Sequence, residues 1–229
     1  MSQHRRLTNN FSLEKAHRTQ ICLSKKIILE DRLPKQVKMV AGVDVSYVGE
    51  LGIGAAVVLD YESLKLLESE VAICHVRMPY IPTLLSFREI PPAMAAIKKL
   101  KSQPDVLLID AQGYAHPYRC GFASHLGLAL GKPTIGVAKS RLIGKPVEMQ
   151  GQTFLVDKEE VIGTVVNTKQ NAKPIFVSIG HMISLETAVK IVVHCSKTRI
   201  PEPTLQAHVL ATKQRKSLML ERKVNITEK

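Results

Sequence analysis

The chain has 229 residues, of which 45% are hydrophobic, and a formal net charge of +12. This length suits one domain with a sizeable core, and no stretch approaches the roughly 18–20 consecutive apolar residues of a membrane helix. The four cysteines form no CxxC pair, and the aromatic residues are only five Tyr and five Phe, which disfavours a zinc knuckle and a surface of many stacked bases.

Most of the excess positive charge lies near the two ends of the sequence. Residues 1–38 contain nine Lys and Arg against three Asp and Glu, and residues 197–229 contain eight against three. If both ends pack on one face, they form a rim that attracts phosphate; solubility charge on surface helices is the alternative. The polar start, Ser2 to Arg6, lacks the apolar run of a secretory signal, so we expect a cytoplasmic protein with reduced thiols.

The first half of the sequence predicts one or two helices and then a group of strands. Apolar positions in residues 8–33 recur with a helical period, and Pro34 closes this segment. Three strands are expected next, joined by short turns into an antiparallel meander: 39–47, 53–60 and 64–76. A helix then runs from about Leu84 to Lys101, and Pro91 and Pro92 should kink or split it.

The second half predicts a strand–helix–strand unit followed by further strands and helices. Strands at 105–110 and 133–138 enclose a helix at Phe122–Leu130, which implies a parallel pair. The remaining expected elements are strands at 161–167 and 174–179, a helix at Leu185–Cys195 capped by Ser184, and a final helix from Thr204 to about Arg222. This order predicts one α/β domain over residues 1–229, with a mixed central β-sheet flanked by helices.

Two aspartates occupy predicted buried strands. Asp110 ends the apolar run Val106–Ile109, and Asp44 lies within the strand expected at 39–47. An ionised carboxylate there needs a partner, and on a mixed sheet the two could lie side by side, where a divalent cation would offset their repulsion. Ligation by oxygen suits Mg²⁺ or Mn²⁺ acting on phosphate. A turn or cap role at a strand end is the alternative for each Asp alone.

Glu89 and His208 are further candidate ligands, and each has a local alternative. The segment from Ser86 to Glu89 matches the S-x-x-E capping box, and the local pattern favours this cap over a metal-binding role. His208 lies near the start of the final predicted helix, where a lone His is usually a surface or core residue. To act as a ligand or a base, it needs that helix to begin beside the carboxylates.

Three other polar residues follow predicted strands or turns. Lys139 follows the strand expected at 133–138, and its cation would there lie near the charge that develops on a reacting phosphate; a surface lysine is the alternative. His116 and His181 follow Gly-containing turns and are weaker candidates.

A short proline-flanked segment, Pro79-Tyr80-Ile81-Pro82, is called the wedge loop below. The two prolines fix φ and stiffen the loop. A rigid loop with an aromatic and an aliphatic side chain at its tip can enter between stacked bases and fill the space of an extruded base. A structural turn with Tyr80 packed inward is the alternative.

Taken together, these segments resemble the endonuclease V family, nucleases that recognise deaminated bases, chiefly inosine. The resemblance extends from about Val40 to Lys216. The order and separation of the matching stretches make it specific: Val40–Asp44, Pro79–Pro82, Ser86–Glu89, Ile109–Gly113, Ala115–Pro117, Pro133–Leu142, Pro174–Ser178 and Pro201–Thr204.

The resemblance implies a ribonuclease H-like fold and a DNA repair endonuclease. It implies that Mg²⁺, with Mn²⁺ as a substitute, is bound by Asp44 and Asp110, that Glu89 and His208 complete the site, and that Lys139 assists catalysis. The wedge loop and backbone groups near Gly113 and His116 would bind the substrate. The implied reaction is hydrolysis of the second phosphodiester bond 3′ to deoxyinosine, leaving 3′-hydroxyl and 5′-phosphate ends, by a monomer.

Two positions depart from the family pattern, which commonly has Gly where Ala111 stands and often has Arg where Leu205 stands. The methyl group of Ala111 could alter the turn or the pocket. Three alternatives remain open: an endoribonuclease for inosine-containing RNA, a binding protein with an inactive site, and a junction-resolving nuclease of similar fold that needs no wedge. The chemically competent ligand set argues against the binding protein.

Overall fold

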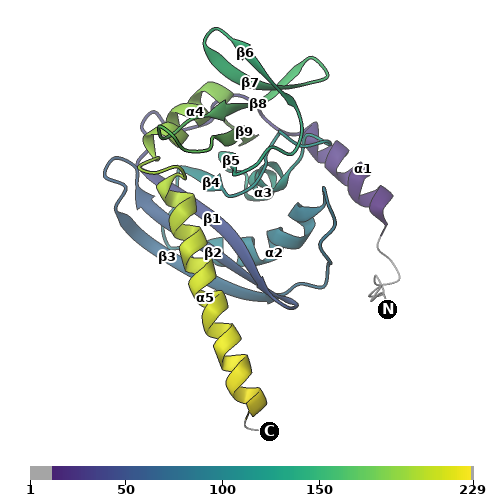
Figure 1. Cartoon of the computed structure of the whole chain (residues 1–229), viewed down its shortest axis with the longest axis vertical. Helices are drawn as coiled ribbons and strands as arrows, with labels where there is room; N and C mark the ends of the chain where they lie inside the picture. Colours follow the sequence, from purple (N-terminus) through teal and green to yellow (C-terminus); the bar gives the residue numbers. More distant parts are fainter. Residues whose placement is uncertain (1–11, 228–229) are drawn as a thin grey trace.

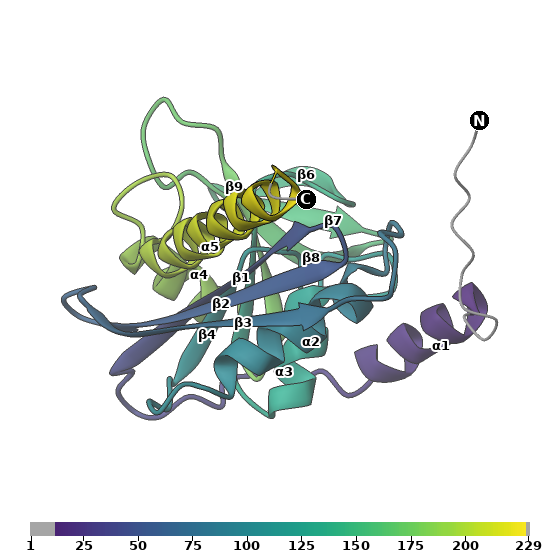
Figure 2. The same cartoon turned by 90° about the horizontal axis from the view of Figure 1, so that it is seen from below.

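A computed structural model describes residues 12–227 of the chain, with side chains up to residue 221. In these residues a nine-stranded mixed sheet has helices on both faces (Figures 1 and 2). The start of the segment expected to be helical, residues 8–11, and the polar start of the chain lie outside the described residues. None of the described helices combines the length and the apolar composition needed to cross a membrane.

The strands form one sheet in which only the central pairs are parallel. Their spatial order is β3 (Leu66–His75), β2 (Leu51–Asp60), β1 (Met39–Val48), β4 (Val106–Ile109), β5 (Thr134–Ala138), β9 (Ile175–His181), β8 (Glu160–Val166), β7 (Gln152–Asp157) and β6 (Lys145–Met149). β4 pairs in parallel with β1 and with β5, and the other neighbours are antiparallel. The predicted meander, the parallel pair and the mixed sheet are therefore confirmed.

The central strands are apolar because both faces of the sheet are covered. Alternate side chains of a strand point to opposite faces. Leu108 of β4 joins a core that includes α4 (Leu185–His194), whereas Leu107 joins a core that includes α2 (Leu85–Ile97) and α3 (Phe122–Leu130). All four residues of β4 are fully buried, so the carboxylate that follows them emerges from the centre of the molecule.

α2 runs through Pro91 and Pro92 as one helix, so of the two expected effects, a kink or a split, the split is wrong. The helix lies directly on the meander, and Gly54 of β2 permits this, since a Cβ at Gly54 would lie 2.0 Å from the carbonyl oxygen of Pro92. The close contact buries Ala93 and Ala96 completely, and this packing offsets the missing proline N–H donors.

The edge hairpin β6–β7 was not predicted. All five residues of β6 are exposed, so no burial pattern marks the strand. The N-cap at Ser184 is confirmed, because its hydroxyl accepts from Thr187 N at 3.2 Å. The last helix, α5 (Glu202–Thr227), begins two residues before the predicted start and continues past Arg222.

The helices described within the two basic end segments, α1 (Leu13–Ser24) and α5, lie on opposite faces of the sheet. α1 lies next to α3, whereas α5 crosses β1 and β2 on the other face (Figures 1 and 2). The described parts of these segments therefore do not form the single basic rim considered from the sequence.

Candidate active site

Asp44 and Asp110 lie on adjacent parallel strands. β1 and β4 pair with Val43 opposite Ile109, which places the next residue of each strand at the same level. The Asp110 amide donates to the carbonyl oxygen of Val43 at 3.2 Å and fixes this alignment. The sheet register thus brings together two carboxylates that are distant in sequence.

His208 reaches the two carboxylates from α5. Its Nδ1 is 2.8 Å from Oδ2 of Asp44, and one ligand atom from each of the three residues lies within 4.8 Å of the others. The helix can approach because Gly42 has no side chain: a Cβ there would lie 1.8 Å from the carbonyl oxygen of Pro203. The requirement stated from the sequence, that the helix begins beside the carboxylates, is met.

Glu89 is buried on α2 and faces the same carboxylates. Burial, together with the nearby charges of Asp44 and Asp110, raises its pKa from 4.5 to about 8, so the protonated form is favoured. The predicted capping box is wrong, because α2 already begins at Leu85 and Ser86 lies inside it, 3.1 Å from Nδ1 of His125. Glu89 is therefore free of a capping role.

The electrostatics of this cluster favour a cation. Burial and the charge of Asp110 raise the pKa of Asp44, although its hydrogen bond to His208 opposes the shift. Carboxylates that resist ionising together become good ligands when a divalent ion neutralises them. Asp44, Asp110 and His208 offer two carboxylates and one imidazole, a donor set rich in oxygen that fits a hard divalent metal ion.

Lys139 directly follows β5, the strand on the other side of β4. Its Nζ forms an ion pair with Oδ2 of Asp110. The strand order β1–β4–β5 therefore places Asp44, Asp110 and Lys139 in a row. The side chain of Lys139 keeps 39% of its surface exposed, so the ammonium group can still reach a phosphate.

A pocket of about 310 Å³ lies beside Asp110 and Lys139. Its other lining residues are Tyr80, Thr83, Leu85, Ser86, Ala111, Gln112, His116, Gly121, Phe122, Ala138, Ser140, Arg141 and Leu142. Tyr80 is 69% exposed, so the alternative in which it packs inward is wrong. Pro79 and Pro82 are also exposed and Ile81 is half-buried; these three do not line the pocket.

Gly113 does not line the pocket but lies between two residues that do, Gln112 and His116. Its amide donates to Oγ of Ser178 at 2.9 Å, and a Cβ would lie 2.2 Å from the carbonyl oxygen of Ile179. A side chain at this position would push the loop of residues 111–121, called the pocket loop below, away from β9. His116 in the same loop is buried, which lowers its pKa to about 4 and keeps the ring neutral.

His181 is not part of the site. Its Nδ1 accepts a hydrogen bond at 3.2 Å from the amide of Ile28, so it anchors the segment that follows α1. Ala111 is buried and lines the pocket, and its φ lies outside the left-handed region, so the departure from Gly causes no backbone strain. Leu205 lies in the first turn of α5 and donates its amide to Pro201 O.

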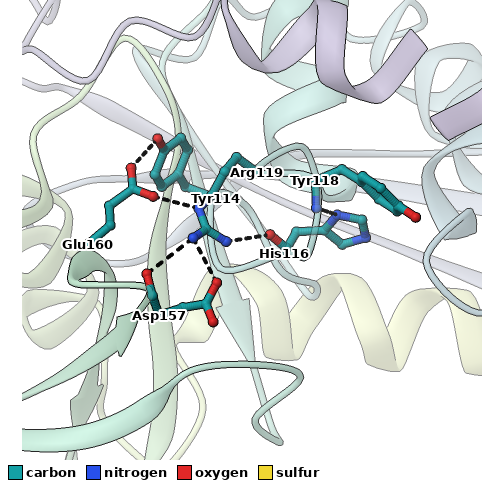
Figure 3. A network of polar contacts seen from close by, with 6 residues as sticks. All are labelled: Tyr114, His116, Tyr118, Arg119, Asp157 and Glu160. Carbon is teal, nitrogen blue, oxygen red and sulfur yellow. Dashed lines mark hydrogen bonds and ion pairs between the residues drawn. The ribbon is translucent and has the colours of Figure 1, made fainter. Parts of the chain in front are cut away.

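Arg119 ties the pocket loop to the β7–β8 turn (Figure 3). Its guanidinium forms ion pairs with Asp157 and Glu160, both at 2.7 Å, and donates to the carbonyl oxygen of His116 at 3.1 Å. The hydroxyl of Tyr114 donates to the same Glu160 at 2.5 Å. The loop that carries His116 is therefore held by a charged network on the side facing β7 and β8.

Replacing Arg119 by Ala should lower the free energy of unfolding by about 1–3 kcal/mol, because two carboxylates and a carbonyl lose their donor. Chemical denaturation of wild type and variant measures this change. Arg18→Ala is the matched control, since Arg18 pairs with Glu14 on the exposed face of α1 and should change stability little. Equal effects of the two substitutions would contradict the bracing role.

Sequence reasoning missed several residues around the site. Gln112 and Gly121 line the pocket, and Tyr47 and Arg215 border the opening over Asp44 and His208. Arg215 had a usable signal, because a residue seven positions after His208 lies on the same face of a helix. Gln112 falls in the matching stretch Ile109–Gly113, but its place in the pocket, like that of Gly121, depends on the contacts of the pocket loop with β9 and α3.

Carboxylates and a lysine aligned on three adjacent strands, with a buried Glu and a His facing them, define a metal-dependent nuclease of the ribonuclease H-like fold. Residues 21–209 match the family model of endonuclease V, and the chain belongs to this family. The expectations of the family and of a hydrolytic nuclease are thereby confirmed.

Individual relatives agree with this assignment. Endonuclease V of Thermofilum pendens is 46% identical over 226 residues, which cover 97% of both chains. Endonuclease V of Rippkaea orientalis is 49% identical over 208 residues, covering 88% of this chain and 90% of the relative. A similar solved structure is that of Ciona intestinalis endonuclease V in complex with a 23mer DNA containing an inosine followed by a ribo-adenosine. Its TM-score is 0.83 and its sequence identity 36%, and the match covers 93% of this chain and 100% of the other.

Proposed function

We propose that this nuclease repairs DNA by recognising deoxyinosine and hydrolysing the second phosphodiester bond on its 3′ side, leaving 3′-hydroxyl and 5′-phosphate ends. We base the proposed substrate on the similarity of this chain to the Ciona protein, which binds inosine-containing DNA. The pocket adjoining Asp110 supports it, because an extruded base held there would keep its strand close to the carboxylates.

The metal ion that we propose is Mg²⁺, with Mn²⁺ as a substitute, held by Asp44, Asp110, Glu89 and His208. When bound, it activates a water molecule and stabilises the leaving oxygen of an in-line displacement. Glu89 gives up its proton to become a ligand, since burial otherwise keeps it neutral. Lys139, already paired with Asp110, neutralises charge on the reacting phosphate.

Substrate recognition is assigned to the wedge loop and the pocket loop. The exposed ring of Tyr80 lies at the pocket edge, where it can enter the stack and replace the extruded base. The neutral ring of His116 and the residue Gly121 line the pocket without net charge, which suits an uncharged base. All these residues come from one chain, which supports action as a monomer. The four cysteines are free thiols, which is consistent with a reducing, cytoplasmic setting.

The test uses a 5′-labelled duplex with one deoxyinosine, a matched adenine duplex, and either Mg²⁺ or EDTA. A single Mg²⁺-dependent cut between the first and the second nucleotide on the 3′ side of deoxyinosine supports the proposal. A cut of equal rate in the adenine duplex, or no cut in either, would overturn it.

A second candidate is cleavage of inosine-containing RNA. The DNA in the Ciona complex carries a ribonucleotide directly after the inosine, so that relative's site accommodates a 2′-hydroxyl there. An inosine-containing RNA strand is therefore assayed beside the duplex. Cleavage of RNA alone would move the function from DNA repair to RNA processing.

Replacing Tyr80 by Ala should reduce kcat/KM on a deoxyinosine duplex by about 10-fold or more, since base–aromatic stacking is worth about 1–3 kcal/mol. The side chain is exposed, so the melting temperature should not change. Tyr61→Ala serves as a control because Tyr61 stacks on His194, away from the pocket. Unchanged cleavage by the Tyr80 variant would favour a junction-resolving nuclease that needs no wedge.

A further inference from the structure

A buried side chain of α1 joins the wedge loop to the pocket loop. Gln20 has no exposed surface, and its amide nitrogen donates to the carbonyl oxygen of Thr83 at 2.7 Å and to that of Cys120 at 3.1 Å. Thr83 follows the wedge loop, and Cys120 lies at the end of the pocket loop. One amide group therefore bonds both to the residue that directly follows the wedge loop and to a residue of the pocket loop.

A second side chain of α1 contacts the same two loops. Nε2 of His17 is 3.2 Å from Oγ1 of Thr83, and its ring stacks on Tyr118 with centroids 4.3 Å apart. Positions 17 and 20 are neighbours on one helix face, because residues three apart lie one above the other. Two adjacent side chains of α1 thus make the same pair of connections independently.

The residue by which α1 holds the end of the wedge loop, Thr83, has a costly backbone conformation. Thr83 has φ of +70°, a left-handed conformation that a non-glycine residue keeps only when its surroundings hold it. At the other end of the loop, the Arg88 guanidinium donates to the carbonyl oxygen of Met78. Both ends are anchored while the ring of Tyr80 is exposed, so the wedge projects from fixed supports.

We propose that Gln20 and His17 are positioning residues that set the distance between the wedge and the base pocket. This inference rests on the proposed function, in which Tyr80 enters the space that the extruded base leaves. Neither residue lines the pocket, so they act through the loops and not on the substrate. If the spacing changes, the wedge opens the stack at a point from which the base does not reach its pocket.

This role predicts a dependence on substrate form that a merely structural role lacks. A duplex needs the wedge, because its base must be extruded from a stack. A single strand presents its bases without that step. Loss of the connection should therefore impair cleavage of a duplex much more than cleavage of a single strand.

The experiment compares kcat and KM of wild type and Gln20→Met on duplex and single-stranded oligonucleotides with one deoxyinosine. Met keeps the length of Gln and removes both donors. We expect kcat/KM on the duplex to fall by about 10- to 100-fold, because a small misplacement far from the reacting atoms has an effect of this size. On the single strand we expect kcat/KM to fall by less than about 3-fold. Ser12→Ala is the control. It removes the N-cap of α1, whose hydroxyl accepts from the amide of Lys15, and Ser12 has no hydrogen bond to either loop.

The ratio of the two substrates decides the outcome. Equal losses on duplex and single strand, or no loss, would overturn the positioning role. If the Gln20 variant does not fold, His17→Ala decides by the same ratio, because this half-buried residue can be removed with less damage. If wild type cuts neither substrate, the proposed function itself fails. If wild type cuts both and the variant has the same ratio of duplex to single-strand kcat/KM as wild type, only the positioning role fails.

Discussion

Asp110→Asn should abolish cleavage of a deoxyinosine duplex while leaving binding intact, with kcat lower by at least about 10³-fold. The substitution preserves the size of the side chain and removes the charge that a metal ion needs beside Asp44. It also leaves Lys139 unpaired and available to a phosphate, so affinity for DNA should be retained. Gel-shift and cleavage assays on the same duplex measure both quantities.

The opposite end of the same strand provides the control. Asp105 precedes β4, and its Oδ2 accepts from the amides of Lys38 and Met39 at 2.7 and 3.0 Å. Asp105→Asn keeps an oxygen acceptor there and lies far from the ligand cluster, so cleavage should persist. If both variants cleave normally, the carboxylate cluster is not the catalytic site. If neither variant is active, the loss in Asp110→Asn results from damage to the folding of β4 and not from loss of a metal ligand.

Glu89→Gln should stop cleavage and at the same time stabilise the protein without metal at alkaline pH. The pKa of Glu89 is raised from an ordinary value of 4.5 to about 8 in the folded chain. The folded state therefore retains a proton that the unfolded state releases, and the free energy of unfolding of wild type declines as pH rises from about 4.5 through 8. Gln carries no charge, so the variant does not show this decline. Above pH 8 its free energy of unfolding should exceed that of wild type by at least about 1 kcal/mol.

Denaturation in EDTA at pH 6 and pH 9 measures this difference. The variant and wild type should differ more at pH 9 than at pH 6, and added Mg²⁺ should raise the stability of wild type more than that of the variant. Glu186→Gln is the control, because Glu186 pairs with Lys190 on an exposed helix face. A variant less stable than wild type at pH 9 in EDTA would contradict the origin that we assign to the raised pKa.

The pair Asp44 and Asp110 was predictable because both follow from strand patterns. Apolar runs identify β1 and β4, and in a parallel pair the residues at corresponding levels become neighbours. Glu89 was less accessible, because its local sequence favours a capping box. The helix starts earlier than that motif implies, since burial of Leu84 and Ser86 against the rest of the fold determines where α2 begins.

Other features could not be predicted because their causes lie far away in the sequence. Gln20 appears in a helical pattern as an ordinary polar residue, and its partners are 63 and 100 residues distant. β6 has no buried side, so the alternation that reveals a strand is absent. The wedge loop was recognised from its prolines, but the outward direction of Tyr80 depends on the anchors at Met78 and Thr83.

The order in which the site residues occur along the chain has a consequence during protein synthesis. Asp44 and His208 are hydrogen-bonded partners separated by 164 positions, and the helix that carries His208 is the last element described. A ribosome therefore completes the sheet and the base pocket before the imidazole is available. Until residue 208 has been added, a growing chain has Asp44 and Asp110 without the imidazole that pairs with Asp44.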